Sequence, residues 1–423
     1  MALFGLDLSP LRESAQYRRL YLAGVVTALG SQATYVTVPF QLKGLTNSPF
    51  DVGALGLVEF VPLIVFGLYG GVLADRLNRR RLIIFSEAAL MATTAMLLVN
   101  ALATRPQVWI LYLDAIVVAA VSSLQRPSIE ALKQGYVAHH RQRAAAALAN
   151  ISNTSASIVG PALGGLVAVA VGPWAVYLAN VVTFAASLSL LFTLHATPRI
   201  EATGERVRLG SGLAYAWSRP DLLGTYVVDL LAMVLAYPVV MLPFVADRFH
   251  ETYALSLLYL SLPAGALVAT LTSPWTRRVH HYGRAIIAAA ALWGLGIALF
   301  GYASSLWIVV LGLVVGGGAD AISGIFRATM WNESIPPDVR GRMAGIEMIS
   351  YSLGPTAGQF RAGVMAAWIS LRFSLTFGGL ACVGSVGAVA LALPRLWSFD
   401  ARHDEHVEAV RVIRSTPRDP EVP

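Results

Sequence analysis

The chain has 423 residues, of which 56% are hydrophobic and only 13% are charged, and its formal net charge is +7. Soluble domains carry about 25% charged residues, so the composition excludes an ordinary soluble protein. The single cysteine, Cys382, excludes an internal disulfide and a metal cluster built on cysteines.

Apolar segments of about 20 residues recur along the chain, and a bilayer core of about 30 Å requires a helix of that length. They predict an all-α polytopic membrane protein with about twelve transmembrane helices. The N-terminal six are expected at residues 19–42, 51–74, 82–102, 108–132, 146–170 and 174–194. The C-terminal six are expected at residues 221–246, 252–274, 284–303, 305–330, 341–368 and 372–394.

Polar segments divide the chain into four predicted regions. These are an N-terminal six-helix bundle (1–194), a cytoplasmic linker (195–220), a C-terminal six-helix bundle (221–396) and a cytoplasmic tail (397–423). The linker is the most polar internal stretch. The tail is charged and contains proline, so we expect it to be poorly ordered.

The placement of the basic residues predicts the orientation. If both termini are cytoplasmic, most of the 31 basic residues fall on the cytoplasmic side, and about four fall outside, as the positive-inside rule requires. The positive charge therefore reflects membrane topology, and no nucleic-acid partner is needed to explain it. Only two basic residues are lysines, and with the richness in alanine and glycine this indicates a GC-rich bacterial genome. We expect the protein in the bacterial inner membrane.

The two halves of the chain look like diverged copies of each other. In the first half, Gln125-Arg126-Pro127 precedes GPALGG at Gly160–Gly165; in the second, Arg327 precedes GPTAGQ at Gly354–Gln359. A membrane protein built from two such repeats places its substrate path at the interface between them.

The loop after the second predicted helix carries the pattern Gly71-x-Leu73-Ala74-Asp75-Arg76-x-x-Arg79-Arg80. It resembles the signature loop between helices 2 and 3 of the major facilitator superfamily. GPALGG resembles part of the antiporter motif of the drug-exporting branches. The arrangement of the chain is most similar to the enterobactin-exporter and macrolide-efflux group. The resemblance implies the fold of that superfamily, with two pseudo-symmetric six-helix bundles.

The resemblance assigns the signature loop a role as a conformational latch on the cytoplasmic side, formed by Gly71, Asp75, Arg76, Arg79 and Arg80. Its expected partner is the start of helix 11, and the alternative reading is a turn that only satisfies the positive-inside rule. The chain departs from the family loop at Asn78, where glycine is usual. Asparagine tolerates the left-handed turn conformation, so we expect the turn to be kept.

The predicted fifth helix carries Gly160, Pro161, Gly164 and Gly165. Glycines four apart let helices approach closely, and proline introduces a kink. Two readings stay open here: a tight, flexible helix contact that limits leak in an exporter, and ordinary helix packing.

Ionisable residues inside membrane spans are costly and usually face an interior cavity. A carboxyl held away from water can bind and release a proton near neutral pH. The candidates for proton coupling are Glu59, which is our first choice, followed by Asp320, Asp229, Glu347 and Asp114. For Asp114, a position at the membrane interface is the alternative.

Other polar and aromatic residues in the spans are candidates for lining a substrate cavity. They are Arg126, Arg327, Arg361, Tyr237, Tyr351 and Gln359. Arg327 and Arg361 are suited to holding a carboxylate charged or to binding an anionic substrate. Arg126 shares a helix face with Glu130, so an ion pair is its alternative, and packing is the alternative for the aromatic residues.

Motifs for other chemistry are missing. The sequence contains no Walker loop, nucleophile elbow or H-E-x-x-H motif. Histidine pairs occur at 139–140 and 280–281, without acidic or cysteine companions that would complete a metal site. We therefore expect no enzyme activity, no cofactor and no metal.

The sequence as a whole predicts a secondary active transporter. We expect it to export an amphipathic small molecule (a drug, a macrolide-like compound or a siderophore) by alternating access, with proton antiport, as a monomer in the lipid bilayer. The alternatives are an importer of a small metabolite and a non-transporting or lipid-handling membrane protein of the same fold.

Overall fold

The computed structural model describes residues 7–76, 78–195, 215–251 and 253–415; the side chains of 68–76, of most positions in 337–349 and of 413–415 are outside the description. Within these ranges the regular structure is helical and contains no strand, as the all-α prediction requires. The chain divides into two compact units, 1–203 with 239–263 and 204–238 with 264–423. We describe each unit by itself.

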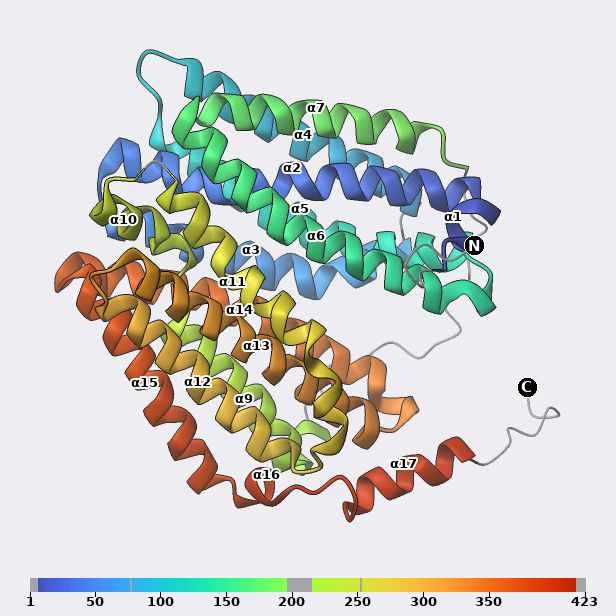
Figure 1. The fold of residues 1–423 in the computed structure, drawn as a ribbon. Coiled ribbons are helices and arrows are strands. Elements are labelled where there is room, and N and C mark those ends of the chain that lie inside the picture. The colour runs from blue at the N-terminus through green and yellow to red at the C-terminus, as the bar shows by residue number, and fades with distance from the viewer. Residues whose placement is uncertain (1–6, 77, 196–214, 252, 416–423) are drawn as a thin grey trace. The chain divides into compact units, whose positions relative to one another are not determined.

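The first unit contains the helices of the N-terminal half. They are α1 (Ser9–Glu13), α2 (Ala15–Thr46), α3 (Pro49–Arg76), α4 (Arg79–Leu102), α5 (Val108–Tyr136), η1 (His139–Arg141), α6 (Gln142–Ala170) and α7 (Pro173–Phe192). Helix α2 packs against α6 and α7, α3 packs against α5, and α4 packs against α5 and α7 (Figure 1). Buried apolar side chains join α2, α4, α5 and α7, among them Leu20, Ile83, Leu132 and Leu191.

A segment from the C-terminal half of the sequence also belongs to the first unit. It contains η2 (Val239–Met241), α10 (Leu242–Ala246), η3 (Asp247–Phe249) and the start of α11 (Ala254–Leu271), up to Pro263. Lys43 of α2 is 9% exposed, forms an ion pair with Asp247 and donates a hydrogen bond to the Pro243 carbonyl oxygen (2.9 Å). This segment is therefore fastened to α2 by a buried charge.

The second unit contains the remaining helices. They are α9 (Pro220–Ala236), η4 (Ser273–Arg278), α12 (Tyr282–Tyr302), α13 (Leu306–Ser334), α14 (Pro337–Trp368), α15 (Leu371–Ala392), α16 (Pro394–Ser398) and α17 (Glu405–Ser415). Helix α12 packs against α13 and α15, and α9 packs against α14 and α15. A Cβ atom at Gly296 would lie 2.6 Å from the Gly312 carbonyl oxygen, so α12 and α13 approach closely only because both positions are glycine.

Among the described residues, ten helical segments are long and apolar enough to cross a membrane. Helices α2 and α14 each have 32 residues but are less apolar. In α2, the polar side chains of Thr34, Thr37 and Gln41 are buried, so the polar residues face the inside of the unit. The total of twelve transmembrane helices stays a prediction.

The span predicted at 221–246 is confirmed within the apolar segment Pro220–Phe249, but it is not one continuous helix. Helix α9 ends at Ala236, and Tyr237 adopts an extended conformation (φ −87°, ψ 113°) before the chain continues as η2 and α10. Pro238 is the physical reason, because proline disfavours helical geometry at the preceding residue and has no N–H to donate.

The expectation of a poorly ordered tail is wrong for residues 397–415. Phe399 is 4% exposed and stacks on Tyr282, with 5.9 Å between the ring centroids. Helix α17 packs against α13, and its Val407 and Val410 are buried. Apolar residues three apart give this charged helix one face that is buried on folding.

Candidate functional site

A cluster of buried charges lies in the second unit, where α9 meets α13 and α14. Arg327 of α13 forms an ion pair with Asp229 of α9, and their side chains are 3% and 4% exposed. The guanidinium also lies 3.8 Å from the Asp320 carboxylate, which is 44% exposed. The structure thus brings together two predicted proton-coupling residues and one predicted cavity residue.

Helix α14 completes the surroundings of this cluster. Ser350 donates a hydrogen bond from Oγ to Asp229 Oδ2 (3.1 Å), and the Arg327 guanidinium lies 5.4 Å from the centroid of the Tyr351 ring. Arg327 Nε has no hydrogen-bond partner among the described residues. A buried donor without a partner is costly, so this nitrogen is suited to bind an oxygen atom of a ligand or a water molecule.

Two further predicted acids lie in the first unit. Glu59 of α3 and Asp114 of α5 are close enough to interact electrostatically. Asp114 is 3% exposed, and its Oδ1 has no hydrogen-bond partner among the described residues. Glu59 is partly buried.

The buried carboxylate of Glu87 on α4 was not among the candidates predicted from the sequence. It is 4% exposed and accepts three hydrogen bonds: from Thr27 Oγ1 (2.7 Å) and Ser187 Oγ (2.6 Å) at Oε1, and from Gln125 Nε2 (2.9 Å) at Oε2. The donors come from α2, α7 and α5. A glutamate inside the predicted helix 82–102 was the signal that could have identified this residue.

Arg361 of α14 is held by hydrogen bonds to backbone carbonyl oxygens of two neighbouring helices. Its Nε donates to the Val234 carbonyl oxygen (3.2 Å) and its guanidinium to the Ser374 carbonyl oxygen (2.9 Å). These bonds tie α14 to the end of α9 and the start of α15. Arg361 is thus held by backbone groups, and its guanidinium is not part of the Asp229 cluster.

The other predicted cavity residues differ in position and exposure. Gln359 is 2% exposed, Tyr237 is partly buried just after α9, and Arg126 is exposed on α5. Glu130 pairs with Lys133 (2.8 Å), so the structure does not show the ion pair that was the alternative for Arg126. Glu347 is partly buried on α14.

Most of the predicted latch lies outside the residues whose side chains the structure describes; this holds for Gly71, Asp75 and Arg76. Arg79 is the first residue of α4. Arg80 donates a hydrogen bond to the Phe192 carbonyl oxygen (2.7 Å) at the C-terminal end of α7, where a cation also interacts favourably with the helix dipole.

Asn78 does not adopt the left-handed conformation expected for it. It is extended (φ −68°, ψ 112°), and its side chain accepts the Arg81 N–H (3.2 Å) as the N-cap of α4. Asparagine is a favoured N-cap residue. Asn78 therefore suits this position because it caps α4, and not because it tolerates a left-handed turn.

The glycines of the helix-5 motif pack α6 against α2. A Cβ atom at Gly160 would lie 2.6 Å from Gln32 Cβ, and one at Gly164 would lie 2.7 Å from Ala33 Cα. Pro161 is buried within α6, and Gly165 is buried as well. Close packing is thus observed, whereas a role in limiting leak stays a prediction.

The family model described as "Transmembrane secretion effector" matches residues 6–415. The enterobactin exporter EntS of Shigella flexneri is 27% identical over 369 residues, which cover 86% of this chain and 88% of that protein. EntS of Citrobacter koseri is 27% identical over 386 residues, which cover 89% and 92%.

Solved structures share the fold. The nucleoside transporter NupG matches with a TM-score of 0.70 at 14% identity, covering 91% of this chain and all (100%) of that one. The D-xylose-proton symporter matches with a TM-score of 0.70 at 14% identity, covering 91% and 97%. The family match shows that the protein is a multi-pass membrane transporter and not an enzyme. The chain belongs to the transmembrane secretion effector family of major facilitator transporters.

Proposed function

We propose that this transporter exports an amphipathic small molecule from a bacterial cell by alternating access, in exchange for protons. The cargo is a drug, a macrolide-like compound or a siderophore. The secretion family and the relatives named enterobactin exporters support export as the direction of transport. We further propose that the protein works as a monomer in the inner membrane, with both termini in the cytoplasm and the signature loop as its latch.

One observation carries proton coupling: two carboxylates, Asp229 and Asp320, share the single guanidinium of Arg327. With all three groups ionised, the trio carries one more negative than positive charge. Uptake of one proton makes the trio neutral, and a neutral group costs less to keep away from water than a charged one. The cluster is therefore a suitable place for a proton to bind and leave.

The same geometry suggests how proton and cargo exchange. A proton on Asp229 competes with Arg327 for the carboxylate and weakens their ion pair. Arg327, whose Nε already lacks a partner among the described residues, then has further donors for an acceptor atom of the cargo. Release of the proton restores the ion pair and displaces the cargo.

Purified protein in liposomes with a pH-sensitive dye inside tests this proposal. Addition of a transported compound should drive proton movement in the opposite direction, and an imposed proton gradient should accelerate export. Asp229→Asn should abolish the coupling, whereas Glu405→Gln should not, because that side chain is 87% exposed on α17. Export that ignores the gradient and moves no protons would refute antiport, and net uptake would refute export.

A further inference from the structure

A cleft of about 240 Å³ lies within the first unit, between α2, α4, α5, α6 and α7. Glu87 lines it together with all three of its hydrogen-bond donors, Thr27, Gln125 and Ser187. The rest of its wall is largely apolar, with Leu20, Ile83, Ile129 and Leu191 among the lining residues. A buried carboxylate thus faces a space bounded by apolar side chains.

The charge of Glu87 is not balanced by a cation among the described residues. Its three partners are neutral donors, and an ionised carboxylate offers about four acceptor positions, so one position at Oε2 stays open. The basic residue that lines the cleft is Lys133, and its ammonium group is bound to Glu130 (2.8 Å). An unpaired buried carboxylate attracts a cation.

We propose that this cleft is a binding subsite for the protonated amine of an amphipathic substrate. The ammonium group donates to the open position of Glu87 Oε2, and the adjoining apolar part of the substrate lies against α2, α5 and α7. Typical ligand pockets have roughly 300–1,000 Å³, so the cleft takes the head group and its first neighbouring groups. The inference rests on the proposed export of an amphipathic molecule, and it favours amine-bearing compounds over anionic siderophores.

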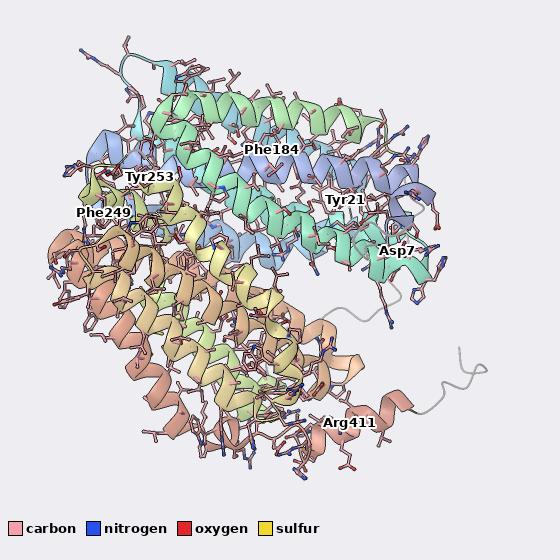
Figure 2. All side chains as sticks on the ribbon, viewed as in Figure 1. Asp7, Tyr21, Phe184, Phe249, Tyr253 and Arg411 are labelled. Carbon is pink, nitrogen blue, oxygen red and sulfur yellow. The ribbon has the colours of Figure 1, made fainter. Side chains whose placement is uncertain are left out.

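The α2 side of the cleft offers a second way to test the subsite. A Cβ atom at Gly24 would meet nothing within 4 Å, so this part of the wall is open. A leucine at position 24 would fill part of this open space from the α2 side. Tyr21, one turn earlier on the same helix (Figure 2), lines the cleft while its hydroxyl donates to the Leu148 carbonyl oxygen (3.3 Å).

The test is equilibrium binding to the purified full-length protein in detergent. The probe is monodansylcadaverine, a fluorescent amphiphile with one primary amine, and its N-acetyl derivative is the uncharged control probe. Glu87→Gln should weaken binding of the amine at least tenfold, with little effect on the acetylated probe. Gly24→Leu fills space in the cleft and should weaken binding of both probes. Gly384→Leu on α15 is the matched control, because a Cβ atom there also meets nothing within 4 Å; it should bind the amine like the wild type.

Three results would overturn the subsite: unchanged affinity of Glu87→Gln that elutes as wild type on size exclusion, equal binding of both probes by the wild type, or no binding of the amine by the wild type. The first would point to a carboxylate that only binds protons or only stabilises the fold. Because this measurement uses no gradient, its failure leaves proton-coupled export standing. Loss of coupling in liposomes with intact amine binding would instead remove the proposed antiport alone.

Discussion

Replacing Arg327 by methionine should strongly destabilise the second unit. Its side chain is 3% exposed and pairs with Asp229, whose side chain is 4% exposed. Removal of one partner of a buried pair leaves an uncompensated buried charge, which costs about 3–5 kcal/mol. Asp320 does not offset this loss, because it carries the same sign of charge as Asp229.

A double-mutant cycle separates the ion pair from the packing of each side chain. Asp229→Leu alone should cost less than Arg327→Met, because Arg327 then keeps Asp320 as a partner 3.8 Å away. The double variant removes both charges, and exchange of a buried pair for apolar residues is often close to neutral. We therefore expect the cost of the double variant to fall short of the sum of the single costs by at least about 2 kcal/mol.

The free energy of unfolding can be followed by tryptophan fluorescence during SDS titration in mixed micelles. Arg126→Met is the matched control, since Arg126 is exposed on α5, and exposed changes usually alter stability by less than about 0.5 kcal/mol. Single variants that lose less than about 1 kcal/mol, or costs that add in the double variant, would refute the reasoning.

Three further predictions concern packing, the segment bound to α2, and the tail. Gly164→Ala should cost about 1–3 kcal/mol by overpacking α6 against α2, whereas Gly44→Ala should not, because a Cβ atom there meets nothing within 4 Å; unfolding titrations measure both. Lys43→Met should increase hydrogen exchange in α10, because it removes the buried ammonium group that pairs with Asp247 and donates to a backbone carbonyl. Hydrogen bonds from Arg402 lower the pKa of Asp400, so their stabilisation of the local tail structure is fully present above the unfolded value of about 3.9. Hydrogen exchange around Asp400 should therefore rise only below about pH 4.

Each of these predictions has a result that would contradict it. Equal stability of the two alanine variants would show that α6 and α2 separate without cost. Unchanged exchange in α10 would show that apolar contacts alone hold this segment. A pH response that persists in Asp400→Asn would assign it to another group.

The spans were predictable because apolar length is the dominant signal in a membrane protein. Helix α4 was predicted at 82–102 and observed at Arg79–Leu102, and α15 was predicted at 372–394 and observed at Leu371–Ala392. The errors arose where the local backbone geometry or the pattern of one helix face differed from what the average hydrophobicity indicates. Pro238 interrupts an apolar stretch that reads as one helix, and the docked tail is too polar on average to reveal its buried face.

The candidate site was only partly predictable. Asp229, Asp320 and Arg327 could be selected as costly charges inside spans, but their proximity depends on how α9 packs beside α13, which a single sequence does not specify. Glu87 shows the complementary difficulty. Its donors Thr27 and Ser187 are neutral residues on two other helices. The sequence gives no indication that such residues bind a carboxylate.

The assignment of residues 239–263 to the first unit has a consequence for the connectivity of the protein. The backbone passes between the units three times, after residues 203, 238 and 263. A single nick at the first passage would therefore leave the halves covalently tethered twice. The last residues before the second and third passages are both prolines, Pro238 and Pro263, and the latter lies inside α11 where it interrupts the hydrogen-bond ladder. Two of the three passages between the units are therefore marked by a proline, which restricts the backbone there.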